Sequence, residues 1–138
     1  MSNTYSNGYG IMIFDTLCKK IGDEAFDSRR TLTFIHISNS VQIIGDAAFR
    51  GCSGLASFNI PNSVTSIGTD AFSGCSSLSS ISIPNSVTSI DYAAFSGCSS
   101  LRAISIPNSV TSLGEMVFAD CTSLTTASIS NGITSIGD

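Results

Sequence analysis

The sequence predicts a repeat solenoid, mostly β, in which a 23-residue unit winds repeatedly around one continuous core. Three successive segments show the period: LASFNIPNSVTSIGTDAFSGCSS (55–77), LSSISIPNSVTSIDYAAFSGCSS (78–100) and LRAISIPNSVTSLGEMVFADCTS (101–123). The same positions are apolar in each of these copies, and 42% of all residues are hydrophobic. A fixed period of this length indicates stacked coils, because a single copy cannot bury its apolar face alone.

The repeat can be followed along most of the chain. Residues 1–8 are polar, with Gly and Asn, and we expect them to form a disordered head. One repeat domain is expected over residues 9–138, with a degenerate capping repeat over 9–31, four full repeats over 32–123 and a partial repeat over 124–138. A degenerate first copy is typical of a cap, because its outer side faces water rather than another coil.

Each repeat predicts two short strands. The pattern LxxIxI, as in Leu78–Ile83, alternates at its end and carries β-branched residues, which favours a strand. Pro61, Pro84 and Pro107 end this strand, since proline cannot donate to a ladder, and the Asn-Ser pair that follows favours a turn. The segment VTSI alternates again and predicts the second strand.

The rest of the unit, xxAFxxC, has room for a single helical or 3₁₀ turn. Acidic residues such as Asp46 and Asp70 precede the Ala-Phe pair. We expect them to cap the amino terminus of this turn, an interpretation that we favour over a calcium site. The phenylalanines recur at one position and should stack along the core, because adjacent coils lie about 4.8 Å apart; they are Phe26, Phe49, Phe72, Phe95 and Phe118.

Composition excludes several classes of function. The net charge is -4, and only 12% of residues are charged, which disfavours nucleic-acid binding because that function needs clustered Lys and Arg. No stretch approaches the roughly 20 apolar residues of a membrane span. The first fifteen residues lack a basic region followed by an apolar run, so they do not form a signal peptide. Either the chain is cytoplasmic or a signal has been removed or replaced.

The consensus IPNSVTSIG followed by xxAFxxCxxL, at a 23-residue period, resembles the BspA-like (Treponema-type) leucine-rich repeats. The resemblance covers residues 9–138 and is strongest over 55–123. It implies a right-handed, curved leucine-rich-repeat coil with a strand ladder on its concave side. It also implies a secreted or cell-surface protein that adheres to host proteins, matrix proteins or other microbes.

The cysteines recur at the repeat period rather than at metal-ligand spacing. Reduced thiols buried at one wall of the core are the interpretation that we favour over disulfides between neighbours or a metal site, and Cys18 is expected in the core as well. The four cysteines of this column are Cys52, Cys75, Cys98 and Cys121. No combination of acid, base and nucleophile is evident around His36, the one histidine, so we expect no enzyme, no metal and no cofactor.

The outward positions of the longer strands are the expected binding surface. Most of them are small and polar, and aromatic or Arg residues among them are the usual interface anchors. Packing of Phe34 under the amino-terminal cap is the alternative to a binding role. The candidate ligand-binding residues are Phe34, His36, Asn59, Ser80, Ser82, Arg102 and Ser105.

The partial last repeat lacks a capping sequence. A coil that stops part-way exposes apolar side chains and strand edges, so we expect either a longer array or contact with a second copy, through Leu124, Ile129, Ile133 and Ile136. The sequence therefore favours a non-enzymatic module that binds or adheres to a protein or glycan through a Ser/Thr-rich strand face. The alternative is a structural protein that self-associates through its carboxyl-terminal end.

Overall fold

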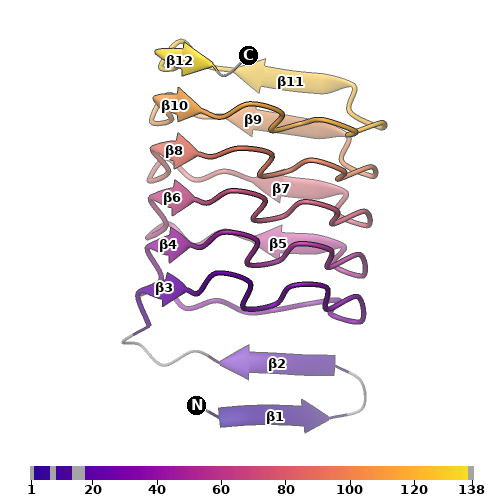
Figure 1. Ribbon diagram of the computed structural model, residues 1–138. Helices are drawn as coiled ribbons and strands as arrows, with labels where there is room; N and C mark the ends of the chain where they lie inside the picture. The colour runs from indigo at the N-terminus through magenta and orange to yellow at the C-terminus, as the bar shows by residue number, and fades with distance from the viewer. Residues whose placement is uncertain (1, 7–8, 14–17, 137–138) are drawn as a thin grey trace.

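The structure is a computed structural model that describes residues 2–6, 9–13 and 18–136, and the side chains of residues 18–134. From residue 18 onward the chain winds as stacked coils around one apolar core (Figure 1). One wall of the stack is a six-stranded parallel sheet whose strands follow one another in chain order. These strands are β3 (Lys20–Ile21), β4 (Ile43–Ile44), β6 (Ser66–Ile67), β8 (Ser89–Ile90), β10 (Ser112–Leu113) and β12 (Ser135–Ile136).

The opposite wall carries the longer strands, β5 (Ser57–Asn59), β7 (Ser80–Ser82), β9 (Ala103–Ile106) and β11 (Thr126–Ile129). β5 pairs with β7 and β9 pairs with β11, in each case parallel and with a register shift of one repeat. The equivalent segment of the preceding coil, 32–37, forms no strand, although Ile35 and Ile37 are buried as the repeat predicts. We call the surface of β5, β7, β9 and β11 the strand face.

The phenylalanine column lies at the centre of the core. Phe49, Phe72 and Phe95 are fully buried. Their rings are stacked, with centroids 5.3 Å apart for Phe49 and Phe72, and 5.4 Å apart for Phe72 and Phe95. Phe58, which belongs to the strand wall, contacts Phe72 edge-on, with the two ring centroids 4.8 Å apart. The one-repeat register brings identical residues into contact, as the sequence pattern predicts, and the solenoid fold is confirmed.

The bend between the two walls differs from the expected helical or 3₁₀ turn. Within the described coils this segment is a series of turns with no helix. Alternate N–H groups bond to the next coil, as from Phe49 to the carbonyl of Ala71 at 2.8 Å, while the others close local turns. The inter-coil bonds replace the bonds of a helix, and they need backbone with positive φ at two points per coil, such as Asp70 (54°) and Gly74 (71°).

The amino-terminal residues also differ from expectation. β1 (Ser2–Ser6) pairs antiparallel with β2 (Tyr9–Ile13), where a disordered head over residues 1–8 and the start of the first coil were expected. The two strands are separated in sequence by Asn-Gly, the dipeptide that most favours a two-residue hairpin. The hairpin is a separate two-stranded sheet at the amino-terminal end of the stack (Figure 1). Residues 7–8 and 14–17 lie outside the described part.

No helix within the described ranges is long and apolar enough to cross a membrane.

Candidate binding site on the strand face

The strand face alternates between buried and exposed side chains. In β5 the side chain of Phe58 is buried, whereas Ser57 and Asn59 are exposed. β7 repeats the arrangement with Ile81 buried between Ser80 and Ser82. The parallel register pairs Ser57 with Ser80 and Asn59 with Ser82. Because strand side chains alternate between the two faces, these four polar groups project from the same surface.

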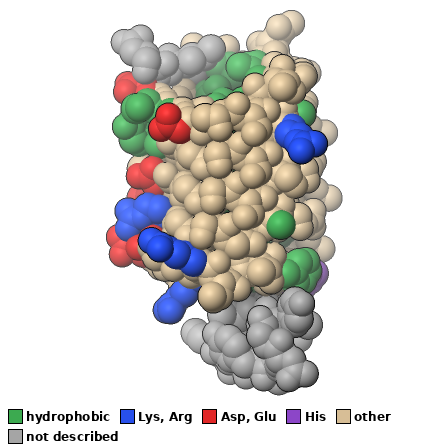
Figure 2. All heavy atoms as spheres, turned by 90° about the vertical axis from the view of Figure 1, so that its right-hand side faces the viewer, with side chains coloured by type: hydrophobic (Ala, Val, Ile, Leu, Met, Phe, Trp, Pro, Cys, Tyr) green, Lys and Arg blue, Asp and Glu red, His purple; other side chains and the backbone are tan. Residues whose placement is uncertain are grey.

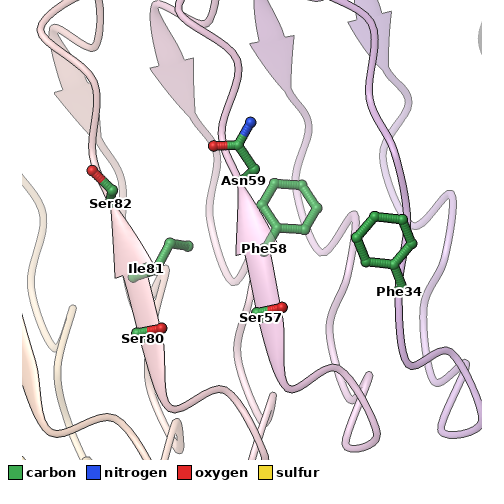
Figure 3. Close-up of a pocket in the computed structure, with 7 residues that line it drawn as sticks. All are labelled: Phe34, Ser57, Phe58, Asn59, Ser80, Ile81 and Ser82. Atoms are coloured by element: carbon green, nitrogen blue, oxygen red, sulfur yellow. The ribbon is translucent and has the colours of Figure 1, made fainter.

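A shallow, open hollow of about 330 Å³ lies on this part of the strand face. Its lining combines an aromatic edge with the polar side chains of the two strands (Figure 3). The lining residues are Phe34 from the preceding coil, Ser57, Phe58 and Asn59 from β5, and Ser80, Ile81 and Ser82 from β7. Phe34 is 52% exposed. None of these residues is charged, so recognition here would depend on hydrogen bonds and apolar contact.

The polar side chains of the hollow have no partner within the described residues. No hydrogen bond joins the side chains of Ser57, Asn59, Ser80 and Ser82 to another described residue, although their backbones lie in the paired strands β5 and β7. The threonines of the VTSI segments differ, because their hydroxyls donate to the backbone of the preceding coil. Thr88 Oγ1, for example, donates to the carbonyl of Thr65 at 3.1 Å. The hydroxyl and amide groups of the hollow are therefore available to a ligand, whereas those threonine hydroxyls are already used.

The structure brings together four of the predicted ligand-binding residues, Phe34, Asn59, Ser80 and Ser82, in this hollow. The other three, His36, Arg102 and Ser105, are exposed but do not line it. The hollow adds Ser57, Phe58 and Ile81. Ser57 lies two residues before Asn59 in the same strand, so the strand alternation in the sequence already places its side chain on the exposed face. No sequence signal shows that the buried side chains Phe58 and Ile81 reach the surface of the hollow.

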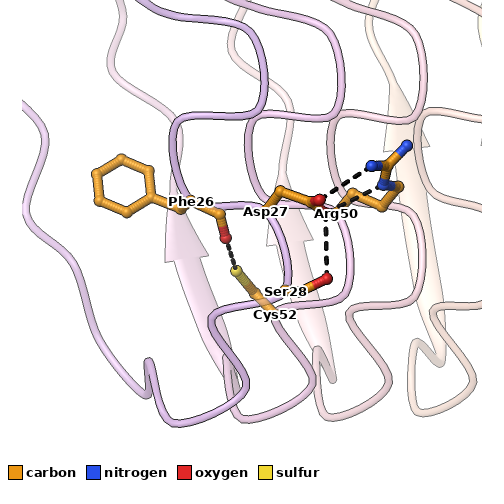
Figure 4. Close-up of polar contacts among 5 residues, drawn as sticks. All are labelled: Phe26, Asp27, Ser28, Arg50 and Cys52. Atoms are coloured by element: carbon orange, nitrogen blue, oxygen red, sulfur yellow. Dashed lines mark hydrogen bonds and ion pairs between the residues drawn. The ribbon is translucent and has the colours of Figure 1, made fainter.

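The cysteine column belongs to the core rather than to a site. Cys52, Cys75 and Cys98 are fully buried and unpaired, and each thiol donates to a phenylalanine carbonyl of the preceding coil. Cys52 Sγ, for example, lies 3.1 Å from the carbonyl oxygen of Phe26 (Figure 4). Burial raises the pKa of Cys52 to about 11 and that of Cys98 to about 12. Such thiols are poor nucleophiles and poor metal ligands.

The acidic side chains of the bend also bond between coils. Asp46 Oδ1 accepts from the backbone N–H of Thr69 at 2.9 Å, rather than capping a helical turn as expected. Arg50 donates two hydrogen bonds to the carboxylate of Asp27, at 2.9 and 3.0 Å (Figure 4). This contact holds the pKa of Asp27 below its usual value. Among the side chains that the structure describes, no group of His, Cys, Asp and Glu could hold a metal ion.

Charge is concentrated away from the strand face. Figure 2 views the stack from the side of the turns that precede β5, β7 and β9. Most of this view shows neither charged nor hydrophobic side chains, and the acidic side chains gather along one edge. Lys20 and Arg50 pair with the nearby carboxylates of Asp23 and Asp27. The side of the stack seen in Figure 2 is therefore largely uncharged, and β5, β7, β9 and β11 contain no charged residue.

The carboxyl-terminal coil leaves core-type positions less covered than in earlier coils. Ile129 is 46% exposed, whereas its counterpart Ile106 in the preceding coil is buried. Leu124 and Ile133 are half-buried, whereas Leu101 and Val110 are fully buried. The side chain of Ile136 lies outside the described part. Three of the four residues expected to self-associate thus present apolar surface at this end of the described stack.

The fold and its repeat define a leucine-rich-repeat solenoid. The chain matches a family model described as the BspA type leucine rich repeat region, in 6 copies over residues 19–138. This match extends over most of the sequence, and the chain belongs to the BspA-type leucine-rich-repeat family. A search of curated protein sequences found no significant match.

Solved structures of bacterial leucine-rich-repeat proteins are similar to this chain. A leucine rich repeat protein of T. pallidum is 35% identical with a TM-score of 0.77, over 78% of this chain and 50% of its own. A leucine rich cell surface protein of Faecalibacterium prausnitzii is 33% identical with a TM-score of 0.76, and the match covers 97% of this chain and 35% of that protein. The pneumococcal vaccine antigen PcpA is 30% identical with a TM-score of 0.74, and the match covers 83% of this chain and 29% of that protein. The chain therefore spans half or less of the length of these proteins.

Proposed function

We propose that this chain is a non-enzymatic binding or adhesion module that holds a protein or glycan ligand on its strand face. The hollow beside Phe34 is the observation that carries the proposal, because it combines an exposed aromatic ring with hydroxyl and amide groups that have no partner among the described residues. Concave sites with an apolar lining and a few polar groups are the usual form of ligand sites. The fold alone does not specify a function, so the argument depends on this site.

The solved neighbours support a role at the cell surface. One is named a cell surface protein and another a vaccine antigen, and both contain more chain than this protein. A module of this kind would act from outside a cell. The strand face has few aromatic or Arg anchors, so each repeat contributes little, and affinity grows with the number of repeats engaged.

The proposal is tested by binding to an array of purified matrix proteins and glycans. Phe34→Ala and Arg102→Glu should each weaken the captured interaction while the urea unfolding midpoint stays unchanged, since both side chains are exposed. The control is Tyr92→Ala, which removes another exposed aromatic side chain that does not line the hollow. Equal losses in all three variants, or ligand capture that none of them weakens, would refute a binding role for the strand face.

Self-association through the carboxyl-terminal coil is the second candidate function. The exposure of Ile129, together with the half-buried Leu124 and Ile133, favours it. A partner that covers these side chains would gain about 25 cal/mol for each Å² of apolar surface buried. Light scattering over a concentration series, with reductant present, should show oligomers that Ile129→Lys dissociates. A monomer at every concentration would refute this candidate.

A further inference from the structure

We infer that the hollow between Phe34, β5 and β7 binds a neutral sugar ring of a glycan, with the aromatic ring of Phe34 as the stacking surface. The inference rests on the proposed function, since it names the class of ligand held by the same site. It follows from three features of the hollow: its lack of charge, its hydroxyl and amide groups without partners, and the placement of its aromatic side chain.

The polar lining matches the chemistry of a sugar. Each serine hydroxyl can donate one hydrogen bond and accept two, and the amide of Asn59 supplies two donors and an acceptor. A sugar hydroxyl likewise both donates and accepts. Ser57, Ser80 and Ser82 share the face with Asn59, so four such groups surround one small space (Figure 3). No carboxylate, guanidinium or ammonium lines the hollow, so a sulfated or uronic-acid ligand would find no counter-charge.

The same groups disfavour a purely apolar ligand. A hydrophobic side chain placed in the hollow would cover polar groups that have no hydrogen-bond partner in the described structure. Each polar group left covered and unpaired weakens binding, because it loses its hydrogen bonds to water and gains none in exchange. A sugar ring can bond to these groups with its hydroxyls and also present its C–H face to an aromatic ring. The ring of Phe34 carries no polar atom and is half exposed at the edge of the hollow, where such a face would pack.

The geometry also disfavours an extended peptide. Peptides that bind by strand addition bond to the backbone at an open sheet edge. The hollow lies instead on the face of the paired strands β5 and β7, where side chains project and the backbone groups join neighbouring coils. Successive strands repeat at about 4.8 Å, a spacing similar to the length of one sugar ring. A glycan that follows the stack would therefore meet equivalent positions on successive coils.

The size of the hollow limits the contact. Its volume of about 330 Å³ is near the lower end of the roughly 300–1,000 Å³ of small-molecule sites. One sugar ring fits this space, and the next ring of the glycan would lie over the adjoining coil, where Ser105 of β9 is exposed. We therefore expect weak binding of a single sugar and tighter binding of a longer oligosaccharide, through the contacts added by each coil.

The test uses the full chain and neutral oligosaccharides as probes: cellohexaose, laminarihexaose, mannohexaose and chitohexaose, with heparin and polygalacturonate as anionic comparisons. Saturation-transfer NMR and calorimetry should detect at least one neutral probe. Phe34→Ala and Asn59→Ala should each weaken it by about tenfold or more, whereas Tyr92→Ala should leave it unchanged. Raising the salt concentration should have little effect on this binding, because the hollow is neutral.

Other outcomes separate the inference from the proposed function. If no neutral probe binds, while a purified protein is still captured in a manner that depends on Phe34, the glycan inference is wrong and the binding function stands. Binding of a neutral probe that the Phe34 and Asn59 variants do not weaken places the sugar elsewhere and also overturns the inference. Binding of heparin alone, lost at high salt, overturns it in favour of a charged ligand. If neither glycans nor proteins bind, both proposals are refuted.

Discussion

Replacing Phe72 by alanine should strongly destabilise the solenoid, because this ring lies in the middle of the phenylalanine column. Phe72 is fully buried, and it contacts Phe49, Phe58 and Phe95 at ring centroid distances of 4.8–5.4 Å. Truncation of a buried phenylalanine to alanine leaves a cavity and typically lowers the free energy of unfolding by about 3–5 kcal/mol. Aromatic pairs of this geometry add about 0.5–1.5 kcal/mol each. We therefore expect Phe72→Ala to lower the free energy of unfolding by about 5 kcal/mol, the upper end of the range for truncation.

The matched comparison is Phe118→Ala, at the carboxyl-terminal end of the same column. Phe118 is only partly buried, and within the described residues its one ring contact is to Phe95, at 6.1 Å. Its truncation should lower the free energy of unfolding by about 1–2 kcal/mol, because folding removes less of its apolar surface from water. Phe34→Ala, on the exposed strand face, should lie within about 0.5 kcal/mol of the unchanged protein.

The assay is equilibrium unfolding in urea, followed by far-ultraviolet circular dichroism. The free energy of unfolding and its urea dependence are obtained together, so a change in cooperativity is separated from a change in stability. The expected order of destabilisation is Phe72, then Phe118, then Phe34. A loss below about 1.5 kcal/mol for Phe72→Ala would refute the assignment of this column as the centre of the core.

Three further predictions follow from the coil geometry. Gly74→Ala should cost about 1–2 kcal/mol in urea unfolding, because Gly74 has a φ of 71° and an L-residue is strained there; an unchanged midpoint would contradict the turn geometry. Cys75 and Cys98 should not react with Ellman's reagent at pH 8 until the protein is unfolded, because burial raises the pKa of both thiols, and rapid native labelling would contradict their burial. The same shifts predict that the buried thiols' contribution to stability is complete below about pH 9, the pKa of an unperturbed thiol. This contribution should be lost as the pH rises from about 9 towards about 12, the folded pKa of Cys98, and stability that stays constant over this window would argue against the raised pKa.

The sequence by itself determined the coil and its core. A 23-residue period with identical apolar positions can be buried only if each coil stacks on the next, so Phe49 and Phe72 could be assigned to one column before any coordinates. The alternation of Phe58 between two polar residues likewise gave the outward positions of β5. These assignments succeed because local pattern and global fold have the same period.

Other features depended on the tertiary structure. The bend that contains Asp70 and Gly74 has a local pattern compatible with a helical turn, but its N–H groups bond to the next coil, and only the stacked neighbour supplies those acceptors. The hairpin of β1 and β2 has a local signal in Asn-Gly, which lies outside the repeat and is therefore not predicted by its period.

The candidate site shows the same division between sequence and structure. The repeat places Asn59, Ser80 and Ser82 on one face, yet the sequence does not show which outward positions enclose a hollow. That depends on how far Phe34 of one coil reaches toward the strands of the next two, and on which hydroxyls are already bonded to backbone. A linear pattern gives the direction of each side chain, whereas the distances between coils and the hydrogen bonds already made are properties of the folded stack alone.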